Sequence, residues 1–106
     1  MKKQIELELL QVCGSPKLLG HKYTALLIYT LISNNMTTNY IYEGYQIVAE
    51  QYNVSAGSVE RAINRYISAA WDLKRPELIA MFSEFRPSNK EFIAMFGVRI
   101  KIKLED

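Results

Sequence analysis

The sequence contains very little cysteine and histidine, since Cys13 and His21 are the only residues of these types among 106. A single cysteine excludes an intramolecular disulfide and any metal site built from several cysteines, and it fits a reducing cytoplasm best. We therefore expect no metal ion, and we expect Cys13 to be a small core residue. His21 lies in the first turn of a predicted helix, where it should face solvent or contact a phosphate.

Long apolar runs are also absent. No stretch approaches the roughly 18 residues that a membrane-spanning helix needs. Near the N-terminus, Glu6 and Glu8 interrupt the apolar residues that a signal peptide would require. The sequence therefore predicts no membrane association.

The motifs of common enzyme classes are missing as well. The sequence has no P-loop, no glycine-rich dinucleotide turn and no cluster of histidine, cysteine and carboxylates at metal-ligand spacing. Cys13 and His21 lie on separate predicted helices, so they make a poor candidate for a nucleophile–base pair. We expect no enzyme activity and no cofactor.

The overall composition is that of one globular domain. A hydrophobic fraction of 49% and a charged fraction of 23% are ordinary for a soluble protein, and no repeat or linker divides the chain. We expect residues 1–106 to form a single domain. Because the net charge is only +2, nucleic-acid binding would have to depend on a local basic face.

The segment EGYQIVAEQYNVSAGSVERAINRYISAAW, residues 43–71, predicts two helices joined by a tight turn. The first helix should end at Tyr52 and be followed by Asn53 in the left-handed conformation, which asparagine tolerates well. Ser55 is a good N-cap for the second helix. This arrangement is typical of a helix-turn-helix, in which the second helix can enter the DNA major groove, about 12 Å wide.

The second of these helices has one apolar face and one polar face. Its apolar residues recur at spacings of three and four: Val59, Ala62, Ile63, Tyr66, Ile67 and Ala70. We expect Val48, Ala49 and Trp71 to share this core, with Tyr52 and Val54 filling the wedge between the helices. An ordinary helical hairpin would show the same stripe, so the pattern alone leaves DNA binding and simple packing both open.

Further helices are predicted on both sides of this motif. Residues 4–12 should form an amphipathic helix that ends at Gly14-Ser15-Pro16, and residues 20–33 a broadly apolar, central one. Residues 34–42 are rich in asparagine and threonine, so we expect a loop. The inward residues of the first helix should be Ile5, Leu7, Leu9, Leu10 and Val12.

The C-terminal third predicts two more helices. Residues 76–85 begin with proline, which suits a first helical turn, and their many apolar residues suggest a surface for homodimer or tandem pairing on DNA. The last helix should start with a capping box of Ser88 and Glu91, and Gly97 suggests a close helix crossing. Residues 98–104 alternate apolar and basic residues, a pattern that suggests a strand.

Two segments, YNVSAGSVERAINRYISAAW and RPSNKEFIAMFGVRIKI, resemble the C-terminal DNA-binding domain of the sporulation regulator Spo0A. The likeness extends from about Gly20 to Lys101, and VERAI and NKEFIAM are its most distinctive parts. It implies an all-α bundle of about six helices around a helix-turn-helix, and it favours helix for residues 98–104. It also implies binding to an A/T-flanked box with a TGTCGAA-like core, often in tandem copies. A receiver domain precedes this domain in the full-length family protein, and the present chain is expected to stand alone without one.

The resemblance also suggests which residues contact bases. Arg61, on the polar face in the second turn of the recognition helix (residues 55–72), matches a base-contacting arginine of the family and could grip guanine. Glu60 is carried over as an acceptor from cytosine N4, although it could equally be a solvated glutamate. Asn64 stands where the family has a second DNA-contacting arginine. Because asparagine can pair with adenine but cannot grip guanine, we expect altered or weaker binding to the family box.

Contacts to the DNA backbone are expected from polar and basic residues around this helix. They are Ser58, Arg65, Lys74, Arg75 and Lys22. Lys74 and Arg75 could instead stabilise the C-terminal end of the recognition helix through its dipole.

The function predicted from the sequence is therefore sequence-specific binding of double-stranded DNA by a transcriptional regulator, in the cytoplasm at the nucleoid. The alternative is a protein-interaction module that kept this fold and pairs with, or antagonises, a related response regulator without binding DNA. A purely structural bundle is a third interpretation, which the resemblance disfavours.

Overall fold

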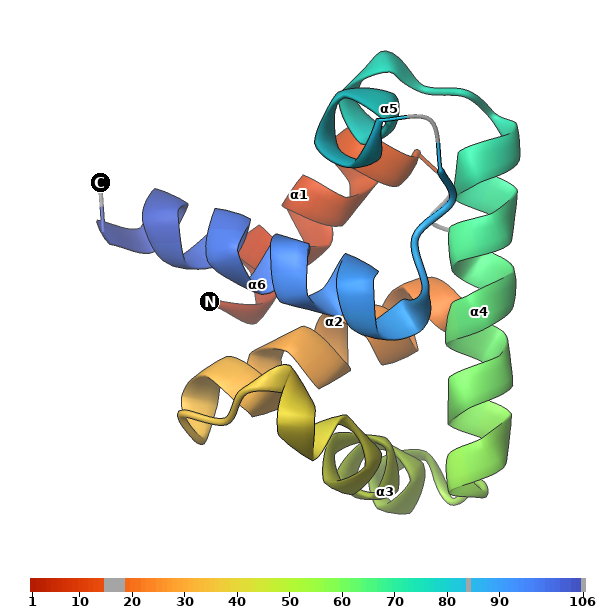
Figure 1. The fold of residues 1–106 in the computed structure, drawn as a ribbon. Helices are drawn as coiled ribbons and strands as arrows, with labels where there is room; N and C mark the ends of the chain where they lie inside the picture. The colour runs from red at the N-terminus through yellow and green to blue at the C-terminus, as the bar shows by residue number, and fades with distance from the viewer. Residues whose placement is uncertain (15–18, 84, 106) are drawn as a thin grey trace.

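Six α-helices and one short 3-10 helix make up the computed structural model, which describes residues 1–14, 19–83 and 85–105. No strand occurs in these ranges, so the predicted all-α class is confirmed. None of the helices described is long and apolar enough to cross a membrane. The elements are α1 (Lys2–Cys13), α2 (Leu19–Ser33), η1 (Thr38–Tyr40), α3 (Ile41–Tyr52), α4 (Ala56–Asp72), α5 (Pro76–Phe82) and α6 (Asn89–Glu105) (Figure 1).

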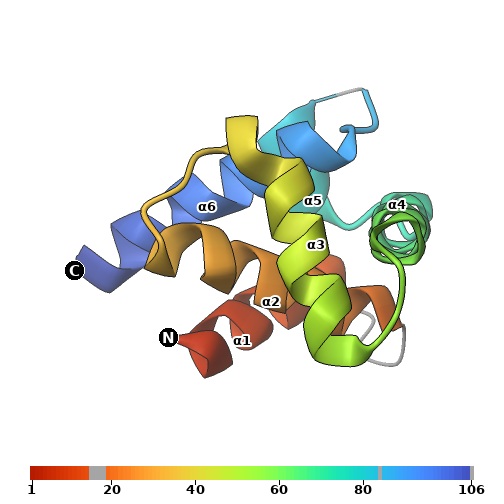
Figure 2. The same cartoon turned by 90° about the horizontal axis from the view of Figure 1, so that it is seen from below.

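The central element is α2, which packs against α1, α3, α4 and α6. Its buried residues run almost continuously from Gly20 to Leu31, as its broad apolar surface predicted. α4 lies along one edge of the molecule, with α3 near its first turns and α5 near its last (Figure 1). Seen from below, α2 lies between α1 and α6 (Figure 2). The bundle therefore holds α4 from one side and leaves its other side open.

The close contact between α2 and α4 depends on Gly20. A Cβ atom added there would lie 2.3 Å from the carbonyl oxygen of Ala62 and 2.5 Å from the Cβ atom of Tyr66. The crossing predicted at Gly97 is wrong, because a Cβ atom at that position would meet nothing within 4 Å. A glycine in the sequence does not by itself show where two helices come close together, because that depends on how the helices pack in the tertiary structure.

The turn of the helix-turn-helix has the predicted geometry. Asn53 follows the last residue of α3 with φ 55° and ψ 48°, and its N–H donates to the carbonyl oxygens of Ala49 and Glu50. Ser55, extended at φ −83° and ψ 154°, caps α4. Asn53 ends α3 and Ser55 starts α4 through local interactions, because each forms hydrogen bonds with backbone groups of the adjacent helical turn.

The core of the motif is mostly as predicted. Its buried side chains include Val48, Ala49, Val59, Ile63 and Ile67. Trp71 is only half-buried. Tyr52 and Val54 do not fill the wedge between the helices, since each is 39% exposed. They lie where α3 gives way to the turn, at the rim of the helix pair, and Tyr52 packs its ring against that of Tyr23 instead.

Two N-terminal predictions need correction. Leu7 was expected to face inward, but it is 55% exposed, because it lies about 200° around α1 from the buried Ile5. The predicted loop 34–42 is partly helical: it contains η1, and α3 already begins at Ile41. Thr37 caps η1 by accepting a hydrogen bond from the backbone N–H of Asn39, so threonine and asparagine here start a helical turn.

The C-terminal elements follow the prediction more closely. α5 ends at Phe82, before Ser83 at φ 60°, and is therefore shorter than the expected 76–85. The capping box is confirmed: Ser88 Oγ accepts from the Glu91 N–H at 3.1 Å, and Glu91 Oε1 accepts from the Ser88 N–H at 3.0 Å. α6 stays helical to Glu105, so residues 98–104 form helix rather than strand. Ser15 and Pro16, predicted to end the first helix, lie outside the described residues.

Candidate nucleic-acid interface

The open side of α4 begins at its N-cap. Ser55 Oγ accepts a hydrogen bond from the backbone N–H of Ser58 at 3.1 Å, and the two hydroxyl oxygens are 2.9 Å apart. The guanidinium of Arg61 donates to Ser58 Oγ at 3.4 Å and lies beside Gly57, where an added Cβ atom would be 3.2 Å from Nη1. Arg61 is thus folded back over the first turn of α4, the end that a recognition helix directs at base edges.

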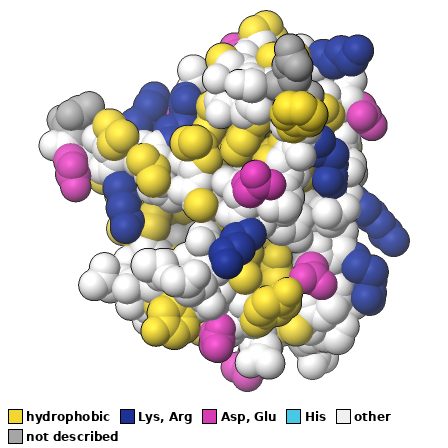
Figure 3. All heavy atoms as spheres, viewed as in Figure 1, with side chains coloured by type: hydrophobic (Ala, Val, Ile, Leu, Met, Phe, Trp, Pro, Cys, Tyr) yellow, Lys and Arg dark blue, Asp and Glu magenta, His cyan; other side chains and the backbone are white. Residues whose placement is uncertain are grey.

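A cleft of about 570 Å³ opens beside this side of α4. All three predicted base contacts line it, together with Arg65. The facing wall comes from η1 and from the first residues of α3 and α6, and includes Asn39, Tyr42, Tyr45, Asn89 and Lys90. In the space-filling view, Lys and Arg side chains gather along the edge where α4 lies (Figure 3). These side chains form the local basic face that a chain with a net charge of only +2 needs in order to bind nucleic acid.

A buried asparagine connects this wall to α4. Asn89, at the start of α6, donates through Nδ2 to the backbone oxygen of Glu60 at 3.1 Å and to the hydroxyl of Tyr45 at 3.2 Å. Its Oδ1 accepts from Nδ2 of Asn64 at 3.3 Å. Burial raises the pKa of Tyr45, which the hydrogen bond from Asn89 only partly offsets, so this phenol stays protonated.

Two basic residues of this region were not among the predicted contacts. Arg86 donates to Ser68 Oγ at 2.9 Å and to the backbone oxygen of Asn64 at 3.1 Å, so its guanidinium lies along α4. Lys90 is exposed on the opposite wall of the cleft. Their sequence signal is slight, because Arg86 only precedes the capping box of α6 and Lys90 lies within it. Only the packing of α6 beside α4 brings them to this surface.

Lys74 and Lys22 lie apart from the cleft. Lys74, exposed at φ 52° in the connection after α4, is 16 residues beyond Ser58, or roughly 24 Å at 1.5 Å per residue. Lys22 lines a separate, smaller cleft with Lys2 and Glu6. The structure therefore brings together Ser58, Glu60, Arg61, Asn64 and Arg65, but not these two lysines.

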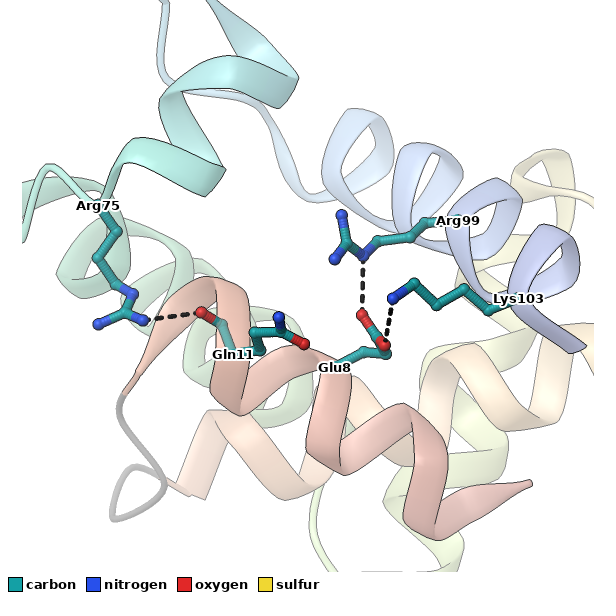
Figure 4. Close-up of polar contacts among 5 residues, drawn as sticks. All are labelled: Glu8, Gln11, Arg75, Arg99 and Lys103. Carbon is teal, nitrogen blue, oxygen red and sulfur yellow. Dashed lines mark hydrogen bonds and ion pairs between the residues drawn. The ribbon is translucent and has the colours of Figure 1, made fainter.

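Arg75 has an intramolecular role. Its Nε donates to the carbonyl oxygen of Val12 at 3.0 Å. Its Nη2 donates to the carbonyl oxygen of Gln11 at 2.7 Å (Figure 4). These oxygens belong to the last turn of α1, whose C-cap is Gly14 with φ 71°. A cation at the C-terminal end of a helix also suits the helix dipole. The helix that Arg75 stabilises is α1 rather than α4.

Cys13 and His21 approach the same residue, Tyr66, but all three are buried. Nδ1 of His21 lies 3.4 Å from the Tyr66 hydroxyl, so neither position predicted for this histidine, solvent or phosphate, is correct. Burial raises the pKa of Cys13 to about 11 and also raises that of Tyr66. Burial lowers the pKa of His21, although Glu6 opposes the shift. These directions keep all three groups neutral, the reverse of what an activated thiolate requires.

No group of three or more potential metal ligands occurs in the part of the chain that the structure describes.

One comparison with known proteins bears on this interface. The model of the family described as "Sporulation initiation factor Spo0A C terminal" matches residues 6–100, from within α1 to near the end of α6. The members of this family are DNA-binding effector domains connected with sporulation and transcription regulation, and the family is not one of enzymes. Because the match covers nearly the whole chain and all six helices, this protein belongs to the Spo0A C-terminal domain family.

Proposed function

We propose that this chain, folded as one domain, is a transcriptional regulator that binds double-stranded DNA sequence-specifically through α4. One observation carries the proposal. The face of α4 that bears Glu60, Arg61 and Asn64 opens onto a cleft with basic walls, while the opposite face is buried in the core. A protein helix is about as wide as the major groove, so the first two turns of α4 can enter it. The cell compartment would be the cytoplasm, at the nucleoid.

The residues divide into base-reading and backbone-contacting groups. Arg61 reads guanine through its paired donors, Glu60 accepts from cytosine N4, and Asn64 faces a third base. Contacts to phosphate and sugar come from residues that lie along α4 and beside the cleft: Ser58, Arg65, Arg86 and Lys90. Lys74, exposed beyond the C-terminal end of α4, is a more distant phosphate contact. Arg75 and Lys22, also predicted as phosphate contacts, are left out, because the donors of Arg75 hold α1 and Lys22 lines another cleft.

Selection of bound sequences from a random DNA pool tests binding and specificity together. We expect an enriched box related to TGTCGAA, changed at the base pair that faces Asn64. Fluorescence anisotropy on this box and on a scrambled duplex then gives the affinity ratio, and log affinity should fall linearly with log salt by about 0.9 per phosphate contacted. A pool that shows no enrichment, with no binding at low salt, would refute the proposal.

A protein-interaction module is the second candidate, favoured by apolar side chains exposed around α5. Leu73 is 58% exposed, Ile79 38% and Phe85 78%. This surface could pair two copies in tandem on DNA, or pair the chain with a related response regulator. Analytical ultracentrifugation with and without DNA carrying one or two boxes separates these cases. If DNA binding is absent and a response regulator binds, the second candidate replaces the first.

A further inference from the structure

The hydrogen bonds around Asn89 determine which way its side-chain amide points. A backbone carbonyl can only accept, so the Asn89 atom 3.1 Å from the oxygen of Glu60 must be the nitrogen. Its second proton is directed at the hydroxyl of Tyr45, 3.2 Å away. Both protons of the Asn89 amide are therefore used, and its Oδ1 can only accept.

This arrangement in turn orients Asn64. The Asn64 atom that faces Oδ1 of Asn89 at 3.3 Å must be a donor, so it is Nδ2. Turning the Asn64 amide over would place two oxygens against each other at this distance. Asn89 cannot turn to relieve the clash, because its own nitrogen would leave the carbonyl of Glu60. At 9% exposure, Asn89 has little access to water as a substitute partner.

Within the described residues, the second N–H of the Asn64 amide and its oxygen make no hydrogen bond, and Asn64 lines the same cleft as Arg61. Adenine offers an acceptor at N7 beside a donor at N6, which matches this pair of groups. Guanine offers two acceptors at the corresponding positions, and its O6 would face the oxygen of Asn64. An Asn64 amide released from Asn89 would distinguish these bases less well, because its NH2 group could turn both protons towards guanine, one to N7 and one to O6, with its oxygen pointing away.

We propose that Asn89 is a positioning residue that presets Asn64 to read adenine, so that the box bound by this chain carries adenine at the base pair facing Asn64. This inference rests on the proposed function, because it needs α4 in the major groove. It goes further by assigning the base and by giving a role to a buried residue that does not itself contact DNA.

Base analogues in the selected box test the reading of adenine. Each adenine is replaced in turn by 7-deazaadenine, which lacks N7, and by purine, which lacks the N6 amino group. At one position both analogues should weaken binding of the wild type roughly tenfold or more, the size of a good two-pronged contact. Asn64→Ala should be insensitive to both at that position, whereas Arg61→Ala should keep the full sensitivity. If the wild type binds its box but no adenine shows this behaviour, the inference is wrong while the proposed function stands.

Variants of Asn89 and Tyr45 test the positioning role. Asn89→Ala frees the Asn64 amide, so the preference for adenine over guanine at that position should fall several-fold, with the preference at the Arg61 position unchanged. Tyr45→Phe removes one of the two acceptors of the Asn89 amide and leaves the carbonyl of Glu60, so it should produce a smaller change of the same kind. An unchanged adenine preference in a folded Asn89→Ala would show that Asn89 only supports packing. If Asn89→Ala does not fold, the exchange of the Asn89 amide protons in the wild type decides.

A measurement without DNA tests the network separately. In NMR spectra of the free protein, the side-chain amide protons of Asn89 should exchange slowly with solvent, and Tyr45→Phe should shift the amide signals of both asparagines. Fast exchange of the Asn89 amide would overturn the preset orientation whatever the protein binds. Absence of DNA binding with a slowly exchanging amide would instead refute the proposed function.

Discussion

Individual residues on α4 are held in different ways although they share one cleft. Arg61 is long and exposed, and its side chain makes one hydrogen bond within the described part of the chain, at 3.4 Å to Ser58. It can therefore move to meet a base without breaking core contacts. Asn64 is shorter and is bonded to the buried Asn89. We therefore expect Arg61 to supply most of the affinity for the box and Asn64 to supply discrimination at one base pair.

Replacing Arg61 by alanine tests its role in reading bases. Arg61→Ala should weaken binding to the selected box by about 1–3 kcal/mol, because a two-pronged contact with guanine is lost, and should change binding to scrambled DNA much less. Arg65→Ala is the matched control. It should weaken both complexes equally and reduce the slope of log affinity against log salt by roughly 1. Equal losses on both duplexes for Arg61→Ala would make Arg61 a backbone contact.

Two glycines allow the contact between α2 and α4 to be tested. Gly20→Ala should lower the free energy of unfolding by about 1–3 kcal/mol or more, because the new Cβ atom would lie 2.3 Å from a backbone oxygen of α4. Gly97→Ala is the same change at a position with nothing within 4 Å, so it should raise stability by up to roughly 1 kcal/mol through helix propensity. Urea unfolding of both variants measures the difference. Equal effects would mean that α2 and α4 do not pack this closely.

At the scale of the elements, the ends of helices and their apolar stripes were the most predictable features. The end of α3, the N-cap of α4 and the capping box of α6 could be read from sequence because each depends on residues within one turn. The burial of Tyr52 and Trp71 was misjudged, because the width of a buried stripe depends on how closely the next helix approaches. The burial of Leu7 was misjudged for a different reason, since helical spacing already places it on the opposite side of α1 from Ile5.

The site was predictable only where it lies on α4 itself. The polar face that carries Glu60, Arg61 and Asn64 followed from helical spacing and the family resemblance. The far wall of the cleft comes from η1, α3 and α6, so the positions of Lys90 and Asn89 required the tertiary structure. The same limit applies to Arg75, whose partners are more than 60 residues earlier in the chain.

The adjacent residues Lys74 and Arg75 should behave differently when removed. Arg75→Ala leaves the last carbonyls of α1 without their donor, so the free energy of unfolding should fall by about 1–3 kcal/mol, with little change in the salt dependence of DNA binding. Lys74→Ala should leave stability within about 0.5 kcal/mol of wild type and reduce the salt slope by roughly 1 if it contacts a phosphate. Thermal unfolding and anisotropy titrations of both variants check these results. If Arg75→Ala has wild-type stability but a smaller slope of log affinity against log salt, Arg75 contacts a DNA phosphate.

At the scale of the whole molecule, the carboxylate of one residue forms ion pairs that connect the first helix with the last. Glu8 on α1 accepts from Nε of Arg99 at 2.9 Å and from Nζ of Lys103 at 3.0 Å, both on α6 (Figure 4). Its side chain is 14% exposed, so water screens these contacts less than at an open surface. Burial tends to raise the pKa of Glu8, but the hydrogen bonds from Lys103 and Arg99 outweigh it and the net shift is downward.

The stability that Glu8 contributes should therefore depend on pH in a defined direction. Because its pKa is lower in the folded state, the contribution is fully present above the ordinary value of 4.5 and is lost as the pH falls through the folded value. Glu8→Gln should lower the free energy of unfolding by about 1–2 kcal/mol at pH 7, and the gap to wild type should narrow below about pH 4.5. Urea unfolding from pH 7 to pH 3 measures this gap. A gap between wild type and Glu8→Gln that stays constant over this range would mean that the ion pairs of Glu8 add no stability.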